Sequence, residues 1–512
     1  MRRLIPFLLV AALAGTACGT SIRKQQAQRL AEANALFMRG CHSCLVRAFD
    51  TYSALRGEGF QPALVTGKAF DAAILLAARE KELAMEATSW IERAEGLLSS
   101  RGPVGPRYLE MVNALPWALG RHDRDFRDGA MIAVGPVLDA LEKWDAALGP
   151  APARDIVGTY LMAAARCAFT PARLQPNLTF DVLAPAHGRT PLMQYAAGIC
   201  SPELRSHLDA LAGDADFHEV TYQLGRLRLY QGGATVHLDA RVLLEAGHTA
   251  MPDAIAVTWL LASVLSALEE HEACAAMYDE VIRRGGARRE SMLNRTVCLT
   301  RAAKRPEAIR SATEIIDTPG ILRGEAYFWR AWNQYHAKNL PVARVDVESA
   351  KTLFQDADVY ALSGFIAYDM DQKDYAYTEF AEALRRNREY CVAAFYQGLI
   401  DSQKEQWEPA AGRYVSATGC YERSVRRLEN DLRQAHALDA DNPTRERRIR
   451  NLTEGLDVEK LQLARAAYNV AYSYGRHGDA AKGLPYAEQA AAAHRDMRKL
   501  AEELLEILRK AG

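Results

Sequence analysis

The sequence predicts an all-α fold in which helical hairpins stack into an α-solenoid. Apolar residues recur at helical spacing along most of the chain, and no stretch shows the sustained alternation of a β-strand. Small residues recur with a period of 33 or 34 residues through the C-terminal half. The 512 residues are 49% hydrophobic and 25% charged, which is typical of a globular protein with a buried core.

Charge balance and motifs restrict the classes of function. The chain has 63 Lys and Arg against 64 Asp and Glu, so it lacks the basic excess that binding to nucleic acid requires. It contains no phosphate-binding loop, dinucleotide fingerprint or nucleophile elbow. His218 and Glu219 begin like a zinc-protease helix, but Tyr222 stands where the second histidine is required. We therefore expect no catalytic residue, no metal, no cofactor and no nucleic-acid partner.

The first element is an export signal over residues 1–17. A basic start is followed by an apolar run too short to span a bilayer, and then by small residues that end at Cys18. This layout resembles the signal of a bacterial lipoprotein, although Gly15 stands where such signals usually carry Leu. The resemblance implies lipid on Cys18 and, because Gly19 follows, an outer-membrane lipoprotein of the cell envelope that faces the periplasm. Secretion without lipid and an uncleaved anchor are the alternatives.

Three segments precede the regular repeats. Residues 18–63 are expected to contain the anchor and a first helical hairpin, with Tyr52 on its second helix. Residues 64–217 are expected to be helical but irregular, because prolines interrupt the apolar stretches. Residues 218–254, which contain Gly225, are expected to form a degenerate repeat.

Four positions recur at the same offsets in neighbouring segments of the C-terminal half. Gly364 and Phe380 are followed by Gly398 and Tyr414, 34 residues later in each case. The full set is Ala262, Cys274, Tyr278 and Val281; Thr296, Ala308, Ala312 and Ile315; Ala331, Ala343, Val347 and Ala350; Gly364, Ala376, Phe380 and Ala383; Gly398, Ala410, Tyr414 and Ala417; and Ala471, Gly483, Ala487 and Ala490. Small residues let the two helices of a hairpin approach closely, and the larger apolar residue fills the space beside them. One hairpin cannot bury both of its faces, so neighbouring hairpins are expected to stack.

This pattern resembles the tetratricopeptide repeat. It assigns repeats to residues 255–424, a helical insertion to 425–463, and a last repeat with a capping helix to 464–512. Together with the export signal, the pattern resembles the tetratricopeptide-repeat lipoproteins of bacterial envelopes, which act as scaffolds. The resemblance implies a protein or peptide partner, with membrane contact through the N-terminal lipid.

Aromatic residues on the first helices form the candidate partner groove. In the architecture that the repeats resemble, the first helix of each hairpin lines the concave surface. The register places seven aromatic residues there: Trp259, Phe328, Trp332, Tyr335, Phe365, Tyr368 and Phe395. Aromatic residues dominate binding energies at interfaces, so the groove would suit an extended peptide, a partner helix or an apolar ligand. The alternatives are that these side chains pack against the opposite helices or are buried under residues 64–213 folding back, and a shift of one residue in register would also turn them inward.

The chain has nine cysteines, and an exported protein can pair those that carry no lipid. Cys391 and Cys420 lie at the two ends of one repeat, which an antiparallel hairpin brings together. Cys41 and Cys44 are expected to form a small disulfide in a turn between two helices, with a redox-active pair as the alternative. Two further candidate pairs are Cys274 with Cys298, either as a disulfide or as buried free thiols, and Cys167 with Cys200.

These features predict an exported, lipid-anchored scaffold that binds proteins or peptides. The alternative is an accessory lipoprotein that binds a hydrophobic ligand or solute for a transporter, similar to the tetratricopeptide component associated with TRAP transporters. A closed apolar pocket lined by Trp332 and Phe365 would favour that alternative. An enzyme is the third class, and it would require His218 and Glu219 to cluster with another ligand in one cleft.

Overall fold

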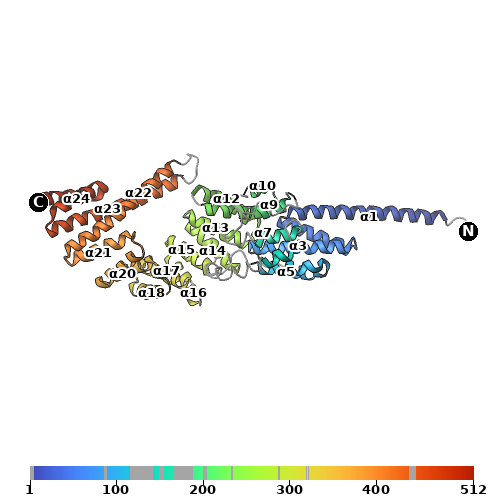
Figure 1. Ribbon diagram of the computed structural model, residues 1–512, viewed down its shortest axis with the longest axis horizontal. Coiled ribbons are helices and arrows are strands. Elements are labelled where there is room, and N and C mark those ends of the chain that lie inside the picture. Colours follow the sequence, from blue (N-terminus) through green and yellow to red (C-terminus); the bar gives the residue numbers. More distant parts are fainter. Residues whose placement is uncertain are drawn as a thin grey trace. The chain divides into compact units, whose positions relative to one another are not determined.

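The computed structural model describes residues 5–85, 89–115, 142–148, 155–165, 188, 190–199, 205–231, 234–285, 289–318, 320, 322–437 and 445–511. Every regular element in these ranges is a helix, which confirms the predicted all-α class (Figure 1). The chain divides into two compact units, Met1–Ser291 and Met292–Gly512, which are called the N-terminal and C-terminal units below. The boundary between them falls inside helix α15 (Arg289–Arg301).

The N-terminal unit begins with three long helices, α1 (Ile5–Arg39), α2 (His42–Gly57) and α3 (Pro62–Leu83). Helices α1 and α2 form a hairpin, in which the hydroxyl of Tyr52 donates a hydrogen bond to Oδ1 of Asn34 at 2.9 Å. Helix α3 packs against α2 and is buried along most of its length. Among the described residues, no helix is both long and apolar enough to cross a membrane.

Short helices complete the middle of the N-terminal unit, where prolines and caps set their starts. Helix α7 begins after Asp155, whose side chain accepts a hydrogen bond from the backbone of Gly158 at 2.9 Å. Helix α9 begins with a proline after Thr190, which caps the helix in the same way. The elements here are α4 (Trp90–Glu95), the 3-10 helix η1 (Leu98–Val104), α5 (Gly105–Ala114), α7 (Ile156–Ala163), α9 (Pro191–Gly198) and α10 (Arg205–Leu211).

Helical hairpins follow each other from α11 to the end of the chain. In the N-terminal unit α11 packs on α12 and α13 packs on α14. In the C-terminal unit the same relation holds for α17 with α18, α19 with α20, and α21 with α22. The bounds are α11 (Glu219–Gln231), α12 (Ala234–Ala250), α13 (Ile255–Ala267), α14 (His271–Arg283), α16 (Arg305–Asp317), α17 (Arg323–His336), α18 (Leu340–Leu353), α19 (Ala357–Asp369), α20 (Lys373–Arg386) and α21 (Cys391–Gln403).

The small residues of the repeat pattern lie where the two helices of a hairpin cross. A Cβ atom on Gly364 would lie 2.6 Å from the ring of Phe380, and one on Gly398 would lie 2.9 Å from the ring of Tyr414. Both rings are buried. The larger residue therefore fills the space that the missing side chain leaves, as the repeat pattern predicts.

The turns inside five successive hairpins share one geometry. Each contains a residue in the left-handed region, with φ between 58° and 63°: Glu269, Ala303, Lys338, Asp371 and Glu405. The backbone N–H of the next residue donates to the carbonyl five positions earlier, at 2.8 to 2.9 Å. This bond is the Schellman closure of a helix C-terminus, and its recurrence shows that the hairpins are copies of one module.

The chain ends in longer helices, α22 (Trp407–His436) and α23 (Arg445–His477), followed by α24 (Ala480–Ala493) and α25 (Arg495–Ala511). Helices α22 and α23 pack along each other (Figure 1). The segment 425–463 covers the end of α22 and the start of α23, so its described residues continue the flanking helices. Helix α25 buries Ala501, Leu504, Leu505 and Leu508 and leaves its acidic residues exposed.

Candidate functional site

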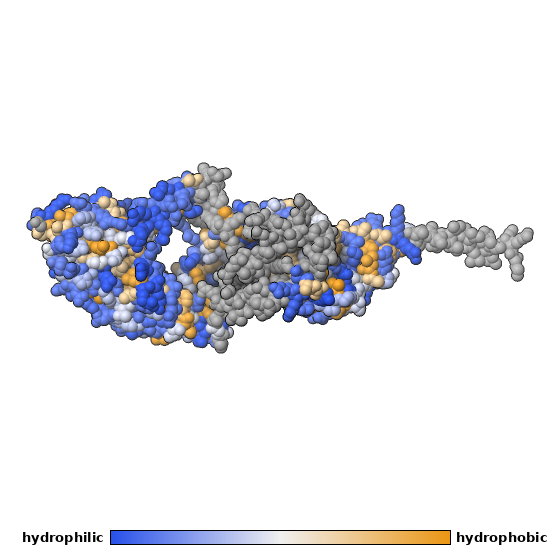
Figure 2. Space-filling view, in the orientation of Figure 1, coloured by the Kyte–Doolittle hydropathy of each residue, from blue (hydrophilic) through white to orange (hydrophobic). Residues whose placement is uncertain are grey.

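Five of the seven predicted groove residues lie half-buried on the first helices of three successive hairpins. They are Trp332 and Tyr335 of α17, Phe365 and Tyr368 of α19, and Phe395 of α21. Figure 2 shows that hydrophilic residues cover most of the visible surface of the C-terminal unit, with apolar residues in small separate patches. A half-buried aromatic side chain keeps part of its surface available for a partner while neighbouring side chains fix its position.

The rings of α19 and α21 form a connected row, whereas on α17 the rings of Trp332 and Tyr335 each contact His336 of the same helix. Tyr396, which the sequence analysis did not select, joins α19 to α21: its ring centroid lies 5.2 Å from that of Phe365 and 5.1 Å from that of Tyr368. Phe395 lies 5.4 Å from Tyr414 at a steep angle. Such edge-to-face pairs are favourable beyond the area they bury, so these contacts stabilise the positions of the rings on α19 and α21.

The prediction that Trp259 and Phe328 line the partner groove is wrong. Both are buried, with exposed fractions of 8% and 7%. Trp259 packs edge-on against Tyr278 of the second helix in its own hairpin, with centroids 6.3 Å apart. Phe328 belongs to a core cluster with Val347 of α18 and Val359 of α19. The position they share in the repeat faces the neighbouring helices in these two hairpins, so these two side chains are core residues.

Polar groups border the aromatic row at the ends of α17 and α19. Burial and the nearby carboxylate of Asp369 raise the pKa of the Tyr335 hydroxyl, and Asp369 acts on Tyr396 in the same direction. Nε2 of Gln403 donates to the hydroxyl of Tyr368 at 2.7 Å. Tyr335 and Tyr396 therefore stay protonated at neutral pH and offer hydroxyl groups beside an apolar surface.

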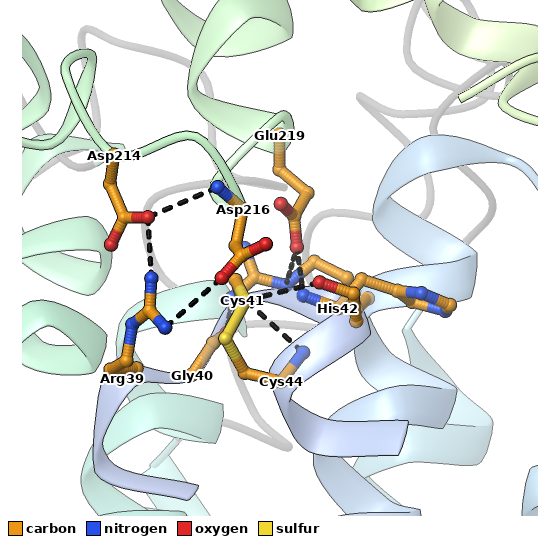
Figure 3. Close-up of a disulfide and its surroundings, with 10 residues drawn as sticks. Arg39, Gly40, Cys41, His42, Cys44, Asp214, Asp216 and Glu219 are labelled. Carbon is orange, nitrogen blue, oxygen red and sulfur yellow. Dashed lines mark hydrogen bonds and ion pairs between the residues drawn. A yellow bond between two sulfur atoms is a disulfide. The ribbon is translucent and has the colours of Figure 1, made fainter. Parts of the chain in front are cut away.

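The Cys41–Cys44 pair is joined by a disulfide at the start of α2 (Figure 3). Cys41 caps the helix, and its sulfur accepts the backbone N–H of Cys44 at 3.1 Å. Both cysteines are 0% exposed. Ion pairs of Arg39 with Asp214 and Asp216 lie beside the bridge. A sulfur buried in this way has no access to an external thiol, so the bridge acts as a structural lock on the turn between α1 and α2.

The structure describes the side chains of four further cysteines. A disulfide joins Cys391 to Cys420, with their Cα atoms 5.4 Å apart. Cys274 and Cys298 are buried, and each is disulfide-bonded. Cys18 lies in the part of α1 whose side chains the structure does not describe. Cys167 and Cys200 lie outside the described residues.

A buried charged cluster in the N-terminal unit escaped the sequence analysis. Arg79 of α3 is 0% exposed, and its guanidinium carbon lies 3.8 Å from the ring centroid of Tyr195. Nη1 of Arg79 is 3.5 Å from Glu82, and Nη2 donates to the carbonyl of Gly40 at 3.1 Å. Glu82 in turn accepts a hydrogen bond from the hydroxyl of Tyr195 at 2.7 Å. The opposite charge and the aromatic face compensate for the loss of water around the guanidinium.

Two more groups complete this cluster around Arg79. The backbone N–H of His42 donates to Glu219, and burial raises the pKa of that carboxyl. Burial, assisted by the charge of Arg79, lowers the pKa of the His42 imidazole to about 4. The cluster joins α2, α3, α9 and α11, so it holds the irregular helices together. In the described part of the chain, no group of three or more His, Cys, Asp or Glu side chains is placed to hold a metal ion.

The comparisons with known proteins give matches among solved structures only. No protein-family model and no curated protein matches the chain. YrrB, described as a tetratricopeptide-repeat protein with an unusual peptide-binding site, is 15% identical with a TM-score of 0.32, over 45% of this chain and 97% of its own. The C-terminal part of a tetratricopeptide-repeat protein from Cytophaga hutchinsonii is 14% identical with a TM-score of 0.39, over 55% of this chain and 99% of its own. The Cut9–Hcn1 structure is 14% identical with a TM-score of 0.33, over 96% of this chain and 94% of its own. The hairpin crossings and turns described above give the chain an all-α, tetratricopeptide-repeat-like fold.

Proposed function

We propose that this protein is an exported, lipid-anchored scaffold that binds proteins or peptides in the bacterial cell envelope. The observation that carries the proposal is the set of half-buried aromatic side chains on α17, α19 and α21, in which those of α19 and α21 are joined through Tyr396. Rigid aromatic side chains supply large contact areas at a low cost in conformational entropy, which is why they dominate binding interfaces. The hydroxyl groups of Tyr335 and Tyr368 would pair with the backbone of a bound segment.

Export is supported by the cysteines and by the N-terminal sequence. All six cysteines whose side chains the structure describes are disulfide-bonded, and disulfides persist in oxidising compartments such as the bacterial periplasm. The first 17 residues have the layout of an export signal and precede Cys18. Lipid on Cys18 would place the protein at a membrane without a spanning helix, and the residue after it favours the periplasmic face of the outer membrane.

The partner groove is tested by photocrosslinking in the native host. A photoreactive phenylalanine analogue replaces Phe365 in the aromatic row, and in a matched variant it replaces Val345, which is 67% exposed on the second helix α18. The proposal expects a discrete protein adduct from position 365 and none from position 345, with mass spectrometry naming the partner. Equal adducts from both positions, or none from position 365, would contradict a groove on the first helices.

The transporter-accessory alternative has no specific observation in its favour among the described residues. It requires an enclosed apolar pocket at Trp332 and Phe365. Two cavities beside Cys391 are lined by other, mostly polar residues. We therefore retain the scaffold as the function that the geometry supports best.

A further inference from the structure

Two neighbouring cavities lie on either side of the Cys391–Cys420 disulfide. The larger has a volume of about 550 Å³ and the smaller one of about 200 Å³. Tyr390 and both cysteines line the two cavities, so the disulfide forms their shared wall. The larger volume falls within the range of about 300 to 1,000 Å³ that is usual for ligand sites.

The two cavities lie beside a second helix, α22, that is longer than those of the preceding hairpins. The second helix α22 has 30 residues, whereas α18 and α20 have 14 each. Arg423 and Arg427 of the larger cavity lie on the part of α22 that continues beyond Cys420, and Glu459 comes from α23. The site therefore does not belong to the repeat module itself and is distinct from the aromatic row on the first helices.

Positive charge exceeds negative charge at the smaller cavity, whereas the charges that line the larger cavity balance. The larger is lined by Arg423, Arg427, Glu389 and Glu459, and the smaller by Arg388 and Arg413. Four guanidinium groups therefore face two carboxylates. Nε of Arg423 lies 3.6 Å from Glu389, which offsets one charge of each sign.

Two of the remaining arginines are exposed to solvent. Within the described ranges, neither Arg388 nor Arg427 has a hydrogen-bond or ion-pair partner, and the same holds for Glu459. Each cavity thus carries one guanidinium that is free to bind a carboxylate in a forked geometry.

The buried side-chain amide of Gln397 can accept a hydrogen bond from a ligand. Gln397 lines the smaller cavity and is 1% exposed. Its Nε2 donates to the carbonyl of Tyr377 at 3.2 Å, but its Oε1 has no partner. An unpaired buried acceptor is costly, and a ligand N–H would satisfy it. A fully ionised anion such as sulfate provides no such donor, whereas an acidic peptide provides both N–H groups and carboxylates.

We propose that the paired cavities bind an acidic peptide segment. Its carboxylates pair with Arg388 and Arg427 on the two sides of the disulfide, and one of its N–H groups donates to Oε1 of Gln397. The disulfide holds the start of α21 against α22 and so fixes the distance between the two arginines.

The test uses the full chain and a short fluorescein-labelled peptide of alternating Ser and Glu, measured by fluorescence anisotropy. Saturable binding is expected, and a Ser–Lys peptide should not bind. The double variant Arg388→Ala/Arg427→Ala should weaken binding by at least about tenfold, because it removes both charge-assisted contacts. Arg427→Gln alone should give a smaller loss. Circular dichroism verifies that each variant is folded.

The matched control, Arg426→Ala/Arg433→Ala, also removes two positive charges, both from α22. It changes no residue that lines either of the two cavities. It should leave the affinity within about twofold, because distant surface charges are screened by salt. Equal losses in both double variants, or no saturable binding, would overturn the proposal. Displacement of the peptide by inorganic phosphate at similar concentrations would reduce the site to a general anion site and also overturn it. Trp332→Ala should not affect binding, so failure here is separable from failure of the aromatic groove.

Discussion

Replacing Gly398 by alanine tests the close helix crossing on which the repeat fold depends. A Cβ atom at this position of α21 would lie 2.9 to 3.1 Å from three ring atoms of Tyr414. The ring has little room to withdraw, because it is 1% exposed and packs against Phe395. Gly412 on α22 is the matched control, since it is exposed and a Cβ atom there would meet no atom within 4 Å.

The two substitutions share one contribution and differ in another. Both replace glycine inside a helix, which gains about 1 kcal/mol of stability. Only Gly398→Ala also overpacks a buried contact, at a cost of about 1 to 3 kcal/mol. Gly412→Ala should therefore stabilise the protein by about 1 kcal/mol, whereas Gly398→Ala should lie between neutral and about 2 kcal/mol destabilising. Gly398→Leu should cost several kcal/mol, because a branched side chain has no space between the helices.

The assay is urea unfolding followed by circular dichroism at 222 nm, a general helix signal. Stacked repeats need not unfold in one step, so the comparison rests on the difference between the two midpoints at equal slopes. A midpoint for Gly398→Ala as high as that for Gly412→Ala would refute the reasoning. It would mean that the crossing at Tyr414 is looser than the structure shows.

Three further perturbations test other parts of the molecule. Because the pKa of His42 falls from 6.5 to about 4 on folding, the unfolded state binds more protons, and stability should decrease as the pH drops from 6.5 to 4. The loss is roughly 3 kcal/mol at full effect, and His42→Asn should flatten this slope in denaturation curves recorded across that range. Trp332→Ala should reduce crosslinking to the partner while the helical circular dichroism stays unchanged; loss of helix would instead make Trp332 a core residue. Cys18→Ser should release the protein from membranes in fractionated cells of the native host, and continued sedimentation with the outer membrane would argue against lipid on Cys18.

The spacing of small residues predicts the hairpin crossings because close packing of two helices leaves a direct mark on the sequence. At Gly364 and Gly398, an aromatic ring of the second helix occupies the space that a side chain would fill. The turns leave no such mark. Ala303 and Glu405 adopt left-handed backbone conformations that glycine would usually supply, so their composition gives no signal. There the packing of the hairpin determines the backbone conformation against local preference.

The candidate site was less predictable for a similar reason. The residue type and repeat position that select Phe395 also select Phe328, and only the packing of the neighbouring hairpins leaves the first half-buried and buries the second. The charged run from Arg79 to Glu82 ordinarily indicates a solvated helix face. It lies inside the protein because aromatic and charged partners from distant segments, including Tyr195, surround it. Contacts between residues more than 100 positions apart cannot be read from local pattern.

The Cys391–Cys420 bridge has a mechanical consequence. It ties residues 29 positions apart, so the intervening chain of one hairpin cannot lengthen when the protein is pulled from its ends. At about 3.6 Å per extended residue, the oxidised chain is shorter by roughly 100 Å of contour than the reduced chain. A protease or translocation motor that threads the polypeptide through a narrow pore would meet a closed loop here and would have to accommodate more than one strand at once.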